Sequence, residues 1–154
     1  MEKPKRKATR IPAYDYTSRN YYFITVCTHE KKCIFGKPGK PNRYGKIAEE
    51  CLQRISAIYP QVYVDKYVVM PNHIHGIIVI DAEKAPALTH IVGQYKMTVT
   101  KRIHKEMPSQ RIWQRSFYDH IIRNQGDYER IWLYIHGNPQ KWDADCYFEE
   151  NGEW

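Results

Sequence analysis

The chain has 154 residues, of which 42% are hydrophobic and 27% are charged, as expected for a single globular domain with a real core. Lysine and arginine number 24 against 17 acidic residues, so the formal net charge is +7, and there are 13 tyrosines and 4 tryptophans. Cations for phosphates and flat rings for unstacked bases are typical of a nucleic-acid binder, although a basic soluble enzyme has a similar composition.

The sequence argues against several classes of protein. No apolar run approaches the roughly 20 residues that span a bilayer, and the N-terminus MEKPKRKATR leads into no signal-peptide core. We therefore expect a cytoplasmic protein with no membrane partner and with reduced thiols. The cysteines form no C-x-x-C pair, so neither a zinc ribbon nor a thioredoxin-type site is indicated; they are Cys27, Cys33, Cys51 and Cys146.

The N-terminal segment differs in composition from the rest of the chain. Residues 1–20 are basic and contain two prolines, which predicts a disordered or loosely docked arm. Such an arm could contact a phosphate backbone, or it could be an ordinary solvated tail. Residues 21–154 then form a single folded domain.

This domain is predicted to begin with a strand, a loop and a helix. Tyr21–Thr28 (YYFITVCT) is rich in aromatic and β-branched residues, the composition of a central strand. Residues 31–41 contain two glycines and two prolines and are predicted to be a loop. From Asn42 to Tyr59, apolar residues recur at steps of three or four, which indicates an amphipathic helix with Asn42 as its N-cap and Pro60 after its end.

The next segment contains the most unusual stretch of the chain, VVMPNHIHGIIVI. Val62–Met70 and His73–Ile80 are predicted to be strands, and the Pro71-Asn72 turn between them is short enough to make them antiparallel neighbours. Binding sites are commonly placed just after such turns.

A pair of histidines opens the second of these strands. Because side chains alternate along a strand, His73 and His75 point to the same face, with alpha carbons about 7 Å apart. Both rings could converge on one ion bound about 2 Å from each nitrogen. Two other readings stay open: partly exposed strand histidines, or core histidines satisfied by backbone carbonyls.

A second amphipathic helix follows a polar loop. It should run from about Thr89 to Lys105, and its inner face carries apolar residues at steps of four, namely Ile91, Tyr95, Val99 and Ile103. Lysines and an arginine gather on other faces. This cluster is either a solvated surface or a phosphate-binding one, and it consists of Lys96, Lys101, Arg102 and Lys105.

The last elements complete a recognisable order. Ile112–Ile122 has the aromatic and β-branched density of a strand, and a final helix is predicted to start near Asp127 as N-cap and to stop at Gly137-Asn138-Pro139. The order β-α-β-β-α-β with an added C-terminal helix predicts an α+β, ferredoxin-like fold with an antiparallel sheet. Proteins with this fold include both binding proteins and enzymes, so the fold alone does not predict a function.

The chemistry can be narrowed further from residue types. An ion bound by the histidine pair needs at least one more protein ligand, and it would act as a Lewis acid on an oxygen of the substrate. A phosphodiester oxygen agrees best with the basic and aromatic composition of the chain. A protein that joined strands would also need a side chain that holds the cut end covalently. Tyr134 is the best-placed candidate, because Asn138 shares its helical face and offers an amide oxygen as third ligand. Alternatively, Tyr134 is a core aromatic residue and Asn138 is a helix C-terminal cap. Tyr118 and Tyr128 are the other candidate nucleophiles.

These residues lie in segments that resemble a known family. YFITVCT, VVMPNHIHGII, QYKMTVTKRI, IWQRSFYDHIIRN and YIHGNPQKW occur in this order, and together they resemble the REP-associated tyrosine transposases and their insertion-sequence relatives, the single-tyrosine HUH transposases. The resemblance covers the chain from about Ile11 to Trp142.

The resemblance implies roles for individual residues. His73-Ile74-His75 matches the HUH motif, histidine, hydrophobic residue, histidine, which binds a divalent metal, usually Mg²⁺ or Mn²⁺. Tyr134 matches the catalytic tyrosine. Asn138 falls where relatives place a polar third ligand that is often glutamine, so this ligand departs from the common pattern.

The resemblance also implies an activity, a metal-dependent nicking and transfer of single-stranded or hairpin DNA through a 5′-phosphotyrosine. A non-catalytic, domesticated module that binds repeat DNA or RNA is the alternative from another class, and a simple phosphodiesterase is a third. In relatives, dimers can place one chain's tyrosine beside the other's metal, so a homodimer is among the assemblies to consider. His136 is close to Tyr134 in sequence but faces off its side of the helix. We expect DNA contacts from basic residues, namely Arg19, Lys96, Lys101, Arg102, Lys105, Arg115 and Arg123.

Overall fold

The computed structural model describes residues 19–81 and 86–139. Its main element is a four-stranded antiparallel sheet with the order β4-β5-β1-β6. The strands are β1 (Arg19–Cys27), β4 (Val62–Met70), β5 (His73–Asp81) and β6 (Tyr118–Ile122). The helices are α1 (Arg43–Gln53), α2 (Ile55–Ile58), α3 (Leu88–Ile103) and α4 (Gln125–Gly137). The predicted ferredoxin-like order with an appended helix is confirmed.

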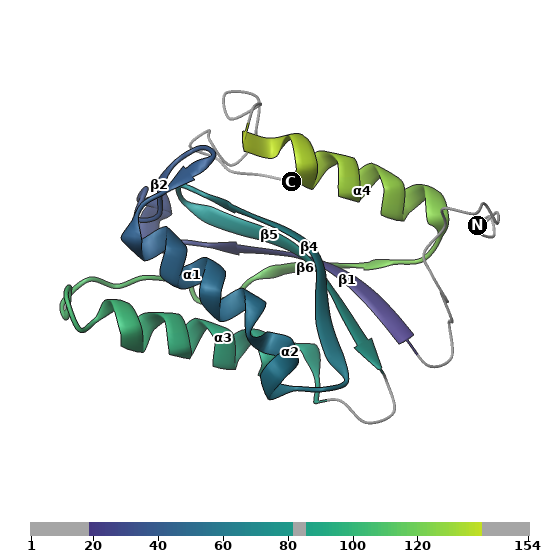
Figure 1. Ribbon diagram of the computed structural model, residues 1–154, viewed down its shortest axis with the longest axis horizontal. Coiled ribbons are helices and arrows are strands. Elements are labelled where there is room, and N and C mark those ends of the chain that lie inside the picture. The colour runs from purple at the N-terminus through teal and green to yellow at the C-terminus, as the bar shows by residue number, and fades with distance from the viewer. Residues whose placement is uncertain (1–18, 82–85, 140–154) are drawn as a thin grey trace.

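The helices form two layers around the sheet. Figure 1 shows α1, α2 and α3 on one face and α4 crossing the other. The larger cluster of buried apolar side chains lies under α1 and α3, and a smaller one lies under α4. The sheet therefore has both faces covered over its central strands.

Strand β5 is the most buried element, because it lies in the centre of the sheet between these layers. Residues 73–80 are all buried, and a strand covered on both faces reads as a continuous apolar run rather than an alternating one. Ile74 and Ile78 belong to the cluster under α1 and α3, whereas Ile77 and Val79 belong to the cluster under α4. The odd-numbered positions of β5 therefore face α4.

The first helix begins as the sequence predicts but does not continue as far. The Asn42 side chain caps it by accepting hydrogen bonds from the N–H groups of Tyr44 and Gly45, both at 2.9 Å. The predicted helix to Tyr59 is interrupted at Arg54, where φ is −89° and ψ is −1°, so α1 and α2 are separate helices. Ile55 is buried directly after the break.

Two other predicted boundaries are corrected by the structure. The loop predicted at 31–41 contains the end of the 3-10 helix η1 (His29–Lys31) and the small hairpin of β2 (Gly36–Lys37) and β3 (Lys40–Pro41). The helix predicted to be capped by Asp127 is capped by Asn124, whose side-chain oxygen accepts from the Asp127 N–H at 2.9 Å. Asp127 instead binds side chains outside the cap.

The strand predicted over Ile112–Ile122 is half as long as expected. Only Tyr118–Ile122 pairs with β1, although Trp113 forms an isolated bridge with Thr28. The aromatic and branched residues at 112–113 are explained by burial in the core. The carbonyls of residues 114–116 accept hydrogen bonds from the Lys96 ammonium, which ties this segment to α3.

The N-terminal boundary lies slightly earlier than predicted. Strand β1 begins at Arg19, two residues before the expected start of the domain. Residues 1–18 of the expected arm lie outside the described residues. No helix in the two described ranges is long and apolar enough to cross a membrane.

Two glycines in helices predict opposite responses to alanine. A Cβ at Gly45 would lie 2.4 Å from the Phe35 carbonyl oxygen, whereas a Cβ at Gly93 meets nothing within 4 Å. We expect Gly45→Ala to lower the free energy of unfolding by about 1 to 3 kcal/mol, because the backbone must shift. Gly93→Ala, the matched control, should raise it by about 0.5 to 1 kcal/mol. Urea unfolding measures both, and a stable Gly45→Ala variant would contradict the close packing of α1.

Candidate active site

The two histidines lie at the start of β5 on the face covered by α4. Their ring centroids are 4.5 Å apart, so His73 and His75 share one face, as the period of two predicts. Both side chains are 0% exposed, so the alternative of partly exposed strand histidines is wrong. The centre is formed inside the layer between the sheet and α4.

Each imidazole is held through its Nδ1 atom by a neighbouring side chain. His73 Nδ1 lies 2.7 Å from the Asn72 amide oxygen, and His75 Nδ1 lies 2.9 Å from the Thr25 hydroxyl. Both of these partners are side chains. An amide oxygen can only accept, so His73 donates its Nδ1 proton and keeps a lone pair on Nε2.

Three buried atoms offer a donor set for a metal. The Nε2 atoms of His73 and His75 and the Oδ1 atom of Asn138 are buried without a hydrogen bond. The amide oxygen is a ligand that suits Mn²⁺ and Mg²⁺, whereas imidazole nitrogen is more usual for transition ions such as Zn²⁺ and Fe²⁺. The described residues contain no group of three or more histidine, cysteine or acidic side chains that could hold a metal. The fit to a divalent ion rests on the three buried donor atoms.

Tyr134 is brought to this centre by α4. Its ring centroid lies 5.2 Å from that of His75 and 6.4 Å from that of Phe23, edge-on in both cases. Phe23 in turn stacks on His75 at 5.4 Å. The sequence prediction that a tyrosine of the last helix approaches the histidine pair agrees with this geometry.

Asn138 lies one helical turn beyond Tyr134. It is 2% exposed and donates its Nδ2 to the Tyr134 carbonyl at 3.1 Å, so part of the side chain does cap the helix. Along α4, Tyr128 packs on Tyr21 and Tyr134 packs on Phe23. The helix therefore runs toward the start of β5, which is the direction in which the Asn138 oxygen must lie to reach a metal there.

The rival tyrosines have different surroundings. Tyr128 donates a hydrogen bond to Asp65 at 2.5 Å. Burial raises the pKa of the Tyr128 phenol, and the hydrogen bond to this carboxylate raises it further, which disfavours the nucleophilic phenolate. Tyr118 is 41% exposed on the edge strand β6, with its ring 6.5 Å from Phe23.

His136 faces away from Tyr134, as predicted. Its Nδ1 accepts a hydrogen bond from the Lys66 ammonium at 3.1 Å, and its ring stacks on Trp132 with centroids 5.0 Å apart. The ammonium also lies 4.1 Å from the Trp132 ring centroid. This cluster joins α4 to β4 and was not predicted, although Trp132 and His136 are spaced four apart on the helix.

The basic residues expected to bind DNA are dispersed. The Lys96 ammonium donates to three carbonyls of residues 114–116, and burial lowers its pKa. Arg102 pairs with Glu50 at 2.8 Å. Lys96, Arg102 and the exposed Lys101 belong to α3, across the sheet from the histidines (Figure 1), and the exposed Lys105 lies in the turn that follows this helix. Arg115 and Arg123 are exposed on either side of β6, and Arg19 begins β1.

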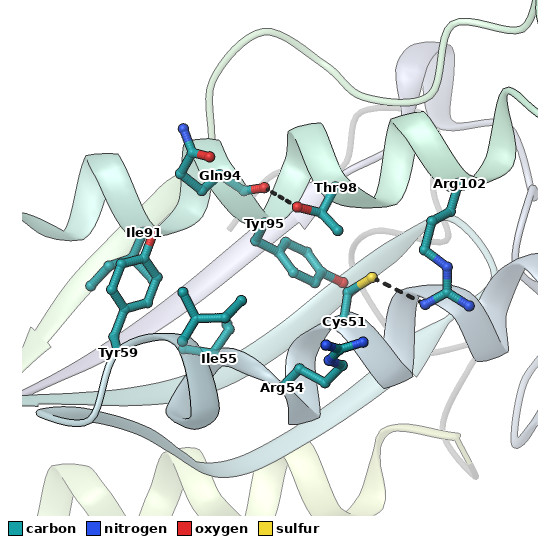
Figure 2. A pocket seen from close by; sticks show the side chains of 10 residues that line it. Cys51, Arg54, Ile55, Tyr59, Ile91, Gln94, Tyr95, Thr98 and Arg102 are labelled. Carbon is teal, nitrogen blue, oxygen red and sulfur yellow. Dashed lines mark hydrogen bonds between the residues drawn. The ribbon is translucent and has the colours of Figure 1, made fainter.

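A cavity of about 180 Å³ lies between α2 and α3, with the end of α1. Figure 2 shows apolar and aromatic side chains along it, with Arg54 and Arg102 beside Cys51. The cavity is lined by residues of the cluster under α1 and α3, so the sheet separates it from Tyr134. The histidine pair is therefore a centre separate from this cavity.

A comparison with protein families assigns the chain to a known family. The family model described as IS200-like transposase matches residues 16–138, a span that includes both histidines, Tyr134 and Asn138. The chain belongs to the IS200-like transposase family. It is therefore a DNA-processing enzyme of the transposase type, and the resemblance identified from the sequence is confirmed.

Individual relatives agree with this assignment. This transposase is 34% identical over 164 aligned residues, 91% of each chain, to an uncharacterized protein of Haemophilus influenzae. A solved structure of a REP-associated tyrosine transposase bound to a REP hairpin has a TM-score of 0.65 at 22% identity, covering 92% of this chain and 74% of that one. A Deinococcus radiodurans protein assigned as a transposase has a TM-score of 0.58 at 14% identity, covering 89% and 97%. At these identities the solved structures support the fold.

The sequence did not reveal Thr25 and Asn72 as partners of the histidines. Asn72 precedes His73 directly, so its position was a usable signal. Thr25 lies 50 residues from His75, and only the pairing of β1 with β5 brings them together.

The Tyr128–Asp65 hydrogen bond predicts an alkaline titration. Because the folded-state pKa of Tyr128 is raised above the ordinary value of about 10, the stability that this phenol contributes is present below about pH 10 and declines above it. We expect native protein and Tyr128→Phe to gain equal phenolate absorbance between neutral pH and about pH 11. In denaturant, the two should differ by one tyrosine. A native-state difference of one tyrosine would show that Tyr128 ionises freely.

Proposed function

We propose that this transposase is a metal-dependent nickase and strand transferase for single-stranded DNA, with Tyr134 as its nucleophile. The observation that carries the proposal is that the Tyr134 ring lies 5.2 Å from the His75 ring, whose centroid is 4.5 Å from that of His73. The Nε2 atoms of both histidines are buried without a hydrogen bond, and a bound ligand would explain such unsatisfied polar atoms.

The metal would be Mg²⁺ or Mn²⁺, held by Nε2 of His73, Nε2 of His75 and Oδ1 of Asn138. When bound, it would supply positive charge to a non-bridging oxygen of the scissile phosphate. The contacts of the two Nδ1 atoms, which are not the proposed ligand atoms, fix the orientations of the rings.

Tyr134 would carry the covalent step. Its phenolic oxygen attacks phosphorus, the bond from phosphorus to the 3′ oxygen breaks, and that oxygen takes a proton and leaves as a 3′-OH. The downstream strand stays on Tyr134 through its 5′ phosphate. Because one phosphodiester replaces another, the 3′-OH of a second strand can reverse the step without ATP. The ordinary phenol pKa near 10 means that a proton acceptor is required, and His136 is turned toward Lys66 instead.

Access to this centre requires movement. Both imidazoles are completely buried, so a phosphate can reach them only when the structure that covers them moves; α4, which packs on His75 through Tyr134, is the element we propose to move. The apolar cluster under α4 is much smaller than the one under α1 and α3, so opening this side costs less. A homodimer that exchanges α4 is one arrangement that would open it.

The partner that we propose is single-stranded DNA with a hairpin. The net charge of +7 favours a polyanion, and the similar REP-associated transposase was solved bound to a hairpin. The other basic residues remain candidates for phosphate contacts, whereas the ammonium of Lys96 already holds the 114–116 segment. These candidates are Arg19, Lys101, Arg102, Lys105, Arg115 and Arg123.

A non-catalytic module that binds repeat DNA is the second candidate. The full burial of both imidazoles favours it, because a binding surface would not need to open this layer. The two candidates differ in whether a covalent intermediate forms.

The covalent intermediate gives the decisive experiment. The protein is incubated with Mn²⁺ and a 3′-labelled hairpin-bearing single strand, whose downstream fragment would remain on the enzyme. We expect a denaturant-resistant labelled adduct with wild type and none with Tyr134→Phe, which should still bind DNA. Tyr128→Phe is the matched control and should form adduct within about threefold of wild type.

Each other outcome of this experiment has a definite meaning. An adduct that survives Tyr134→Phe would identify a different tyrosine. Cleavage without an adduct would indicate water as nucleophile. Tight binding without cleavage would establish the non-catalytic module.

Metal removal tests the role of the histidines. EDTA treatment, His73→Ala and His75→Ala should each lower adduct formation at least about 100-fold, because the phosphate charge is no longer neutralised. DNA binding measured by fluorescence anisotropy should change little, since surface cations supply it. His90→Ala on α3 is the control and should behave as wild type. Full nicking by metal-free protein would contradict the metal-dependent mechanism.

A further inference from the structure

Asn72 is bound on three sides in the turn between β4 and β5. It is 5% exposed, its Oδ1 lies 2.7 Å from His73 Nδ1, and its Nδ2 donates to the Lys31 carbonyl at 3.4 Å. Its backbone carbonyl accepts from both the N–H and the hydroxyl of Thr28, at 3.0 and 3.1 Å. The amide is therefore fixed with its oxygen toward the imidazole and its NH₂ group toward Lys31.

The segment that holds Asn72 is itself in an unusual conformation. Glu30 and Lys31 have φ values of 55° and 56°, in the left-handed region that side-chain-bearing residues rarely adopt. The Thr28 hydroxyl also donates to the Lys32 carbonyl at 2.8 Å, and the Lys31 N–H donates to the Thr28 carbonyl at 3.1 Å. Strained backbone persists only where the surroundings fix it. This turn, residues 28–32, carries the Lys31 carbonyl to Asn72.

We propose that Asn72 is a positioning residue, which keeps the proton of His73 on Nδ1 and the lone pair of Nε2 directed into the metal site. The value of this arrangement for metal binding rests on the proposed function, whereas the position of the proton does not. The turn 28–32 extends the chain of contacts behind His73 to the end of β1.

The two histidines are held unequally. The amide oxygen of Asn72 can only accept, so it admits one neutral tautomer of His73. The hydroxyl of Thr25 can donate or accept, so it admits both tautomers of His75. The Asn72 contact therefore leaves Nε2 of His73 as the metal-binding atom in advance, whereas the Thr25 contact would let His75 take either tautomer.

The proton position can be measured without a metal. Long-range ¹H–¹⁵N NMR of histidine-labelled, metal-free protein at mildly alkaline pH distinguishes Nδ1–H from Nε2–H. We expect His73 to carry its proton on Nδ1 in wild type and in Asn72→Asp, which retains the acceptor, and a mixture of tautomers in Asn72→Leu. A wild-type His73 that is protonated on Nε2 would overturn the inference, even if every variant failed to fold.

Metal affinity is the second readout, by calorimetric titration with Mn²⁺. We expect Asn72→Leu to bind about 10- to 100-fold more weakly, and Asn72→Asp to bind at least as well as wild type. Thr25→Val should lose only a few-fold, and Thr98→Val on α3 is the matched control without effect. Circular dichroism and thermal melts confirm that each variant is folded.

These readouts separate the inference from the proposed function. A folded Asn72→Leu variant with wild-type tautomer and Mn²⁺ affinity would overturn the positioning role and leave the transposase mechanism intact. A wild-type protein with the expected tautomer and no Mn²⁺ binding would overturn the metal mechanism instead, while supporting the role of Asn72 in setting the proton.

Discussion

The register between β1 and β5 is the constraint on which the candidate site depends. Thr25 lies directly opposite His75 in this pairing, so its hydroxyl reaches the imidazole from a neighbouring strand. A slip of one residue would turn both histidines into the apolar cluster under α1 and α3. The antiparallel ladder therefore decides on which side of the sheet the chemistry can occur.

The two faces of the sheet differ in their energetics. The face under α1 and α3 buries the larger set of apolar side chains and supplies most of the stability. The face under α4 buries two imidazoles and the oxygen of Asn138 without full hydrogen bonding, and each such buried polar atom costs about 1 to 3 kcal/mol. The face under α4 is therefore the less stable of the two, and it is the face at which the proposed metal and phosphate would bind and from which α4 would move.

Local sequence patterns predicted much of this arrangement. The period of two placed His73 and His75 on one face, the spacing of four placed Asn138 one turn from Tyr134, and Asn42 was recognisable as a helix cap. Each of these features depends on residues within a few positions of one another. For the same reason, β4 and β5 were predicted nearly to the residue, whereas the break at Arg54 was not.

By itself, the sequence determined the order of elements, the shared face of the histidine pair and the family to which the chain belongs. Only the tertiary structure decided that the pair is buried, that Thr25 holds His75, and that the Lys96 ammonium stabilises a loop. In the strand predicted over Ile112–Ile122, the first half is instead an irregular segment that packs in the core around Trp113. These outcomes depend on contacts between residues far apart in the chain, which strand register and packing determine and local periodicity does not.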